Sequence, residues 1–128
     1  MTAETDPEAA RLFASREMWR LGRDRGLFVP LPSPEEAAAQ TFSDAERLRI
    51  ERLRGRALYG TPAVVGSQLR ALASEYGVEE IAILTTLHSP AARQQSYTLL
   101  AHEFGLCRRT APDSLKARTD AAISGNSL

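Results

Sequence analysis

Side chains capable of chemistry occupy two short stretches of this 128-residue sequence. The first is the end of the apolar run IAILTTL, 81–87, where Thr86 and His88 stand close together. The second is the start of a predicted helix at Gly60 and Thr61, and helix N-termini bind phosphate and other anions. Each has a simpler explanation, because His88 can hydrogen-bond a loop and Thr61 is a good helix N-cap. The candidates are His88 for catalysis, and Gly60, Thr61 and Thr86 for cofactor binding.

The other reactive side chains favour structural roles. Arg93 and Tyr97 lie one helical turn apart on a predicted helix, which predicts packing and an ion pair to a neighbouring element. Cys107 follows that helix with no base near it in the sequence, which argues against a nucleophile. A single cysteine excludes an intramolecular disulfide, and two histidines are too few for a histidine-rich metal site. We therefore expect no metal site.

The composition predicts one globular domain of ordinary size. Hydrophobic residues make up 43% and charged residues 25%, as in typical globular proteins. Sixteen basic and sixteen acidic side chains cancel, so we expect neither nucleic acid nor an anionic membrane as a partner. No apolar run approaches the ~20 residues of a bilayer-spanning helix, and the acidic N-terminus lacks the apolar core of a secretory signal. A cytoplasmic location is expected.

Local sequence signals predict several helices and one long connector. Pro7 suits the first position of a helix, and apolar residues recur after it at helical spacing. Capping-box patterns at Ser33 and Ser43 predict further helix starts. The expected organisation is a helix over 7–25, a proline-rich connector over 26–42, a helix over 43–56, a unit of alternating strands and helices over 57–105, and a disordered tail over 107–128.

The helix at 43–56 is rich in arginine, which raises the question of nucleic-acid binding. Glu46 and Glu51 interleave with the arginines, and a spacing such as Glu51 to Arg54 gives an ordinary helical ion pair. Mixed charge of this kind favours a solvated surface. The arginines are Arg47, Arg49, Arg52, Arg54 and Arg56.

The segment 57–105 predicts an α/β arrangement. The short run 57–59 and the longer run 80–87 fit strands buried in a parallel sheet. A predicted helix follows each of them, which is the alternation typical of α/β proteins. Two strands alone would leave both edges of the sheet open. Either a partner chain completes the sheet, or this chain is a segment of a larger barrel.

The stretch GTPAVVGSQLRALASEYGVEEIAILTTLHSPAARQQSYTLLAHEFGL resembles the C-terminal end of bacterial luciferase-like flavin-dependent monooxygenases. Upstream, ETDPEAARLFAS and LPSPEEA are also similar to that family, so the resemblance covers about residues 4 to 106. The sequence departs from the family pattern at Ala63, at Ser89 and at Gln94 with Gln95. The matching residues are Gly60, Thr61, Pro62, Val65, Leu69, Gly77, Val78, Glu80, Thr85, His88, Ala92, Arg93, Ser96, Tyr97, Leu99, Leu100 and Ala101.

This resemblance implies an α/β fold in which 1–106 is the C-terminal segment of a (β/α)8 TIM-type barrel. The segment would hold about strands seven and eight with their helices, and would be helix-rich and incomplete as a single chain. The family chemistry uses reduced FMN and oxygen, and the flavin carries it. Because the family's flavin contacts come mainly from earlier strands, we expect a partial flavin-dependent oxidoreductase that is inactive and binds no FMN alone. Whether this chain is an enzyme stays open.

Two non-enzymatic functions stay open as alternatives. The predicted helices within 43–76 could form a helix-turn-helix DNA-binding module. Zero net charge and the buried-looking run 81–87 count against that alternative. The second is an assembly subunit, which would form a homo-oligomer or bind a partner that supplies the missing N-terminal half of the barrel.

Overall fold

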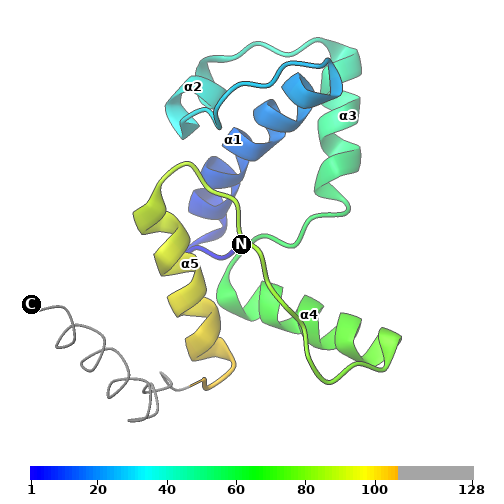
Figure 1. Cartoon of the computed structure of the whole chain (residues 1–128), viewed down its shortest axis with the longest axis vertical. Helices are drawn as coiled ribbons and strands as arrows, with labels where there is room; N and C mark the ends of the chain where they lie inside the picture. Colours follow the sequence, from blue (N-terminus) through cyan, green and yellow to red (C-terminus); the bar gives the residue numbers. More distant parts are fainter. Residues whose placement is uncertain (107–128) are drawn as a thin grey trace, which may run out of the picture.

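The structure is a computed structural model that describes residues 1–106, and these residues form five α-helices joined by loops and extended segments (Figure 1). The bounds are Asp6–Asp24 for α1, Pro34–Ala39 for α2, Asp44–Arg54 for α3, Pro62–Tyr76 for α4 and Pro90–Glu103 for α5. No helix within 1–106 combines the length and the apolar character needed to cross a bilayer. Cys107 and the predicted tail at 107–128 lie outside the described residues.

Local capping sets where these helices begin and end. The Thr5 side chain caps α1 by accepting a hydrogen bond from a main-chain N–H three residues on. Ser33 and Ser43 each form a complete capping box with the glutamate three residues later. Gly77 ends α4 in the left-handed conformation, with a φ of 61°, which glycine adopts without steric cost.

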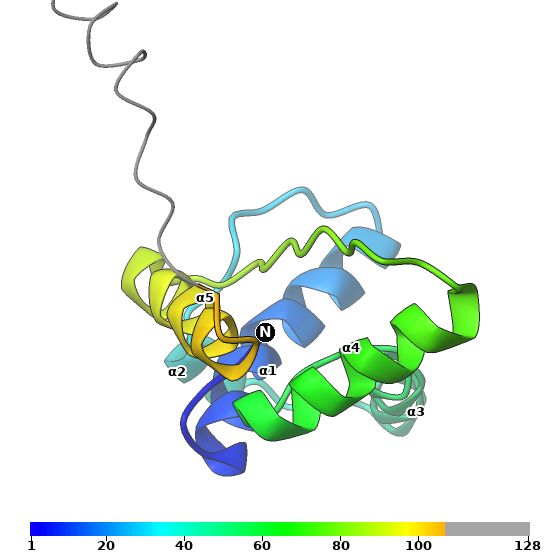
Figure 2. The same ribbon diagram turned by 90° about the horizontal axis from the view of Figure 1, so that it is seen from below.

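The helices pack in two groups, since α1 packs against α2 and α3 while α4 packs against α5 (Figure 1). The segment between α4 and α5 runs across the molecule from the far end of α4 to the start of α5 (Figure 2). One hydrophobic cluster is centred on α1, and the other joins α4 to α5. The first holds Ala3, Ala9, Leu12 and Leu87, and the second holds Val65, Leu69 and Leu100.

The first residues of the chain connect these two groups. Thr2 forms an isolated parallel β-bridge with Gly60, and the Ala3 N–H donates to the Gly60 carbonyl at 3.1 Å. The Thr2 N–H also donates to Ser96 Oγ at 2.8 Å, and Thr2 Oγ1 donates to the Ser96 carbonyl at 2.7 Å. Thr2 and Ser96 are both buried, at 1% and 2% exposure. The start of the chain, at Thr2, is therefore held to α5 by hydrogen bonds that are shielded from solvent.

The predicted fold class, a TIM-type barrel segment, is wrong for 1–106, where the regular structure is entirely helical. The predicted strand over 57–59 is a loop that leads to the bridge at Gly60. The predicted strand over 80–87 contains no strand residue and joins no ladder. A strand is stabilised by hydrogen bonds to a neighbouring strand. The apolar pattern favours extended backbone, but 80–87 finds no such neighbour among the described residues.

The arginine-rich helix α3 is tied to α1 by ion pairs. Arg49 binds Asp24 at 2.9 Å, and Arg54 binds the buried carboxylate of Glu17 at 2.9 Å. The Glu17 carboxylate raises the pKa of Arg54. Helices α3 and α4 make no packing contact with each other. They therefore do not form the adjoining pair that a helix-turn-helix module requires.

Candidate functional site

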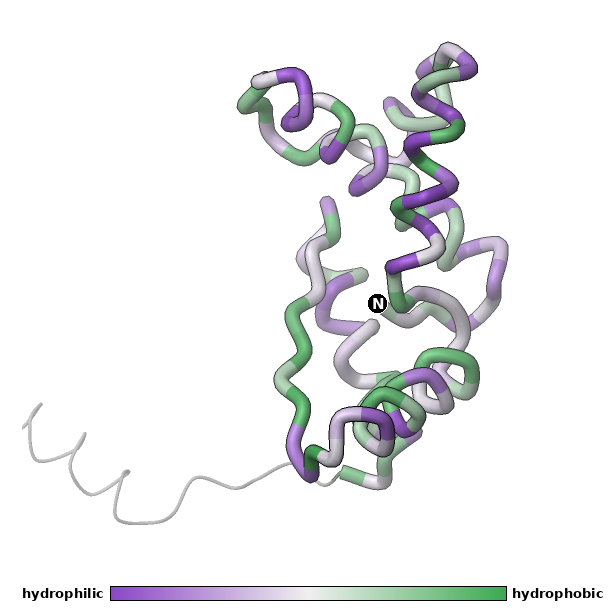
Figure 3. The backbone as a smooth tube through the Cα atoms, turned by 90° about the vertical axis from the view of Figure 1, so that its right-hand side faces the viewer, coloured by the Kyte–Doolittle hydropathy of each residue, from purple (hydrophilic) through white to green (hydrophobic). Residues whose placement is uncertain are grey.

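An apolar groove with a cavity volume of about 550 Å³ lies between α4 and the extended segment that leads into α5. Figure 3 shows this segment as a nearly continuous hydrophobic stretch. Its walls include Leu58, Leu72, Ile81, Ile83 and Thr86. The volume falls within the range of about 300–1,000 Å³ that is typical of ligand sites. The groove can therefore hold a small apolar molecule or apolar side chains of another polypeptide.

Side-chain exposure alternates along the C-terminal half of the extended segment. Thr85 and Leu87 are buried, at 5% and 7% exposure, whereas Leu84 is 91% exposed. Ile81 and Ile83 are also exposed, at 39% and 38%. Period-two alternation is what an extended chain produces when one side packs and the other does not. At its C-terminal end the segment thus has a buried side, at Thr85 and Leu87, and an uncovered side, at Leu84.

The main chain of this segment makes almost no hydrogen bonds to the rest of the described chain. No main-chain hydrogen bond joins residues 79–84 to any other part of 1–106. The Val78 N–H still bonds back to the Ala73 carbonyl at the end of α4, at 3.0 Å. The next bond is from the Thr85 N–H to Tyr97 Oη, at 2.9 Å. Between these two points, the main-chain donors and acceptors have no partner within 1–106 and lie beside an apolar groove.

One charged side chain borders the groove. Arg16 on α1 lines it, and its guanidinium lies 6.0 Å from the centre of the Phe13 ring. Phe13 in turn stacks on Tyr59, with ring centres 4.3 Å apart. Within 1–106 no group of three or more histidine, cysteine or acidic side chains could hold a metal ion. The lining of the groove is therefore mainly apolar.

The candidate residues from the sequence fall in different environments. Thr86 lines the groove, but Gly60, Thr61 and His88 do not. His88 is an exposed residue just before Ser89, which caps α5 through a bond from the Ala92 N–H. The catalytic candidate therefore has no partner in the groove.

The anion-binding prediction at the start of α4 has a specific physical explanation. The Thr61 N–H donates to Asp6 Oδ1 at 3.2 Å, so a carboxylate from α1 already lies at this helix start. The Thr61 side chain makes no capping bond. Gly60 has a φ of 145°, and a Cβ there would lie 3.3 Å from Val64 Cγ1. Backbone conformation and close packing account for the glycine.

Sequence reasoning did not identify two contacts that organise this region. The bond between Asp6 and Thr61 spans 55 residues, and no local pattern signals it. Tyr97 was expected to pack, but its hydroxyl also accepts a main-chain bond from Thr85. The apolar groove residues were visible only as separate helical and extended patterns. Their juxtaposition depends on how α4 and the segment before α5 cross.

Comparisons with known proteins give relatives that are much longer than this chain, and no family model matches it. Over 102 residues, 80% of the chain, it is 36% identical to uncharacterized protein YceB of Bacillus subtilis (strain 168), of which the match covers 31%. It is also similar to the crystal structure of apo-MsnO8, with a TM-score of 0.72 and 30% identity over 84% of this chain and 33% of that one. The chain thus spans about a third of the length of these relatives.

The resemblance to luciferase-like monooxygenases is corrected by these findings. The named sequence relative is uncharacterized, and the described residues are helical where that family predicts barrel strands. The assignments as luciferase-like, flavin-dependent monooxygenase and TIM barrel are therefore not supported. Several motif positions have structural roles instead. Ser96 binds Thr2, and Tyr97 binds the main chain of Thr85.

Proposed function

We propose that this chain is a non-enzymatic assembly module that binds a complementary polypeptide through the open groove. The observation that carries the proposal is the extended segment Ile81–Thr86, which is apolar and has one uncovered face. Soluble proteins rarely leave extended apolar segments with free main-chain groups uncovered. The interface proposed here is the groove together with that uncovered face.

The proposed partner is a different polypeptide rather than a second copy of this chain. The relatives carry the matching region as about a third of one longer chain. In such a chain, the remaining two thirds is permanently close to the matching region. A polypeptide equivalent to that remainder is therefore the occupant that we propose for the groove.

The driving force is burial of apolar surface. Leu84 is 91% exposed, and covering a leucine side chain fully contributes about 2 kcal/mol. Ile81 and Ile83 retain more than a third of their surface for further burial. Charge has a smaller part in recognition, because the run IAILTTL has no charged residue and Arg16 is the one charged side chain that lines the groove.

Co-expression tests this proposal. The tagged chain is co-expressed with the part of YceB that lies outside the matched residues, and the complex is measured by copurification and sedimentation. We expect a one-to-one complex that Leu84→Asp abolishes. The matched control is Leu48→Asp, because Leu48 is a 54% exposed leucine on α3 that does not line the groove. No complex with the wild-type chain, or equal loss with both variants, overturns the proposal.

The oxidoreductase function expected from the sequence stays a prediction, as does its cofactor. An assembly module needs no flavin, so titration of the chain with FMN should give no saturable fluorescence quenching. Stoichiometric quenching would contradict a role without a cofactor. A cytoplasmic location is part of the same proposal, and fractionation of cells producing the tagged chain tests it.

A further inference from the structure

We infer that the partner contributes a β-strand, which pairs with one defined edge of the extended segment Ile81–Thr86. This inference rests on the proposed assembly function and adds the mode of recognition. An extended peptide can join a strand edge through main-chain hydrogen bonds, and the alternate side chains then give specificity. The segment offers those free main-chain groups, because no main-chain bond joins 79–84 to the rest of 1–106.

The bond to Tyr97 shows which edge of the segment is already occupied at Thr85. Successive residues of an extended chain direct their N–H groups to opposite edges. The Thr85 N–H points to the edge where the Tyr97 hydroxyl accepts it, at 2.9 Å. The N–H groups of Ala82, Leu84 and Thr86 therefore point to the other edge. We assign the partner strand to that even-numbered edge.

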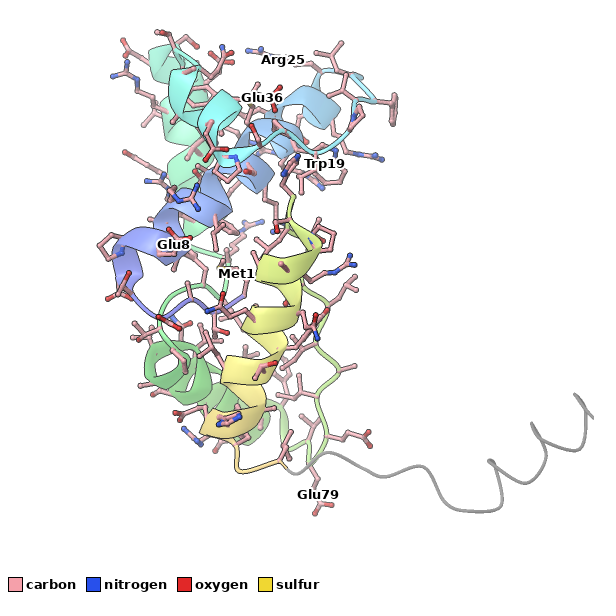
Figure 4. All side chains as sticks on the ribbon, turned by 90° about the vertical axis from the view of Figure 1, so that its left-hand side faces the viewer. Met1, Glu8, Trp19, Arg25, Glu36 and Glu79 are labelled. Atoms are coloured by element: carbon pink, nitrogen blue, oxygen red, sulfur yellow. The ribbon has the colours of Figure 1, made fainter. Side chains whose placement is uncertain are left out.

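The side chains agree with this placement. Thr85 and Leu87 are buried, so the odd-numbered side chains face the core at the C-terminal end of the segment, while Ile81 and Ile83 are 39% and 38% exposed. Leu84, on the opposite face, is 91% exposed. A strand added at the even-numbered edge would extend both faces sideways, so apolar partner residues would pack beside Ile83 and Leu84. Glu79, at the α4 end of the segment, points away from the helices (Figure 4).

The same fold already contains a short pairing of this kind. Thr2 and Gly60 form a parallel bridge, with the Ala3 N–H donating to the Gly60 carbonyl at 3.1 Å. The bridge stops after one pair, so it supplies no ladder for 81–86. A strand from outside the described residues would replace water as the partner of the even-numbered edge.

Proline at Ala82 tests the pairing directly. Proline removes the main-chain N–H, and its φ near −65° is compatible with an extended segment. A residue before proline prefers extended backbone, and the chain between α4 and α5 is drawn out rather than coiled (Figure 2). Ala82→Val is the matched control, because it adds a similar apolar volume but keeps the N–H. Circular dichroism and the unfolding midpoint of each variant alone verify that both remain folded.

The readout is affinity for the co-expressed remainder of YceB. We expect Ala82→Pro to weaken the complex about tenfold or more, through the lost bond and the unpaired partner carbonyl. Ala82→Val should bind within about threefold of the wild type, since it removes no hydrogen bond. Equal affinity of all three chains overturns strand pairing but leaves the assembly function standing. Failure of the wild-type chain to bind overturns the assembly function itself.

Amide hydrogen exchange gives an independent measurement on the unmodified chain. In the complex, the amides of Ala82, Leu84 and Thr86 should exchange at least about tenfold more slowly than in the chain alone. Slow exchange at these three positions supports the assignment of the edge. Unchanged exchange at these positions in a stable complex overturns it, whatever the proline variant does.

Discussion

Replacing Ser96 with alanine removes the acceptor that satisfies the buried Thr2 N–H. That N–H reaches Ser96 Oγ at 2.8 Å, and both residues are at most 2% exposed. A buried donor left without a partner costs about 1–3 kcal/mol. Alanine recovers about 0.5 kcal/mol through its higher helix propensity. The expected net loss is therefore about 0.5–2.5 kcal/mol of unfolding free energy. At about 4 °C per kcal/mol for a chain of this size, the midpoint should fall by about 2–10 °C.

The matched control for this experiment is Ser15→Ala on α1. Ser15 is also a buried helical serine, but its hydroxyl has no hydrogen-bond partner within 1–106. Removing an unsatisfied polar group is neutral or stabilising. Urea unfolding followed by circular dichroism at the helical band measures both variants against the wild type. If Ser96→Ala is no more destabilising than Ser15→Ala, the Thr2–Ser96 network does not hold the chain start to α5.

Three further predictions concern the helix ends. Ser43→Ala should lower the unfolding free energy by about 1 kcal/mol, because it breaks the capping box of α3, and thermal denaturation checks this. Gly77→Ala should cost about 1 kcal/mol, since alanine is strained at a φ of 61°, and an unchanged urea midpoint would refute it. Hydrogen bonds from Ser33 and Ser43 lower the pKa values of Glu36 and Glu46. The unfolded chain therefore binds more protons below about pH 4.5, so stability should fall as the pH drops through that range, which urea titrations at several pH values would detect.

The helix ends could be read from the sequence because their causes are local. Serine caps, prolines in first turns and Gly77 act on residues within about four positions along the chain. The sequence predicted that the arginines of α3 form ion pairs, but it did not predict the partners. Arg49 and Arg54 bind acidic groups on α1, more than 20 residues away, rather than the glutamates of their own helix.

The sequence could not determine the state of 81–87, because strand formation depends on a neighbour. An apolar run rich in β-formers favours extended backbone, and the backbone here is extended without a ladder. Nor could it foresee that Asp6 would occupy the helix start at Thr61, or that Tyr97 would take one edge of the segment. Local sequence therefore determined where the helices begin and end. Only the tertiary structure decided which polar groups were satisfied and which edge stayed open, because those contacts join residues far apart in the chain.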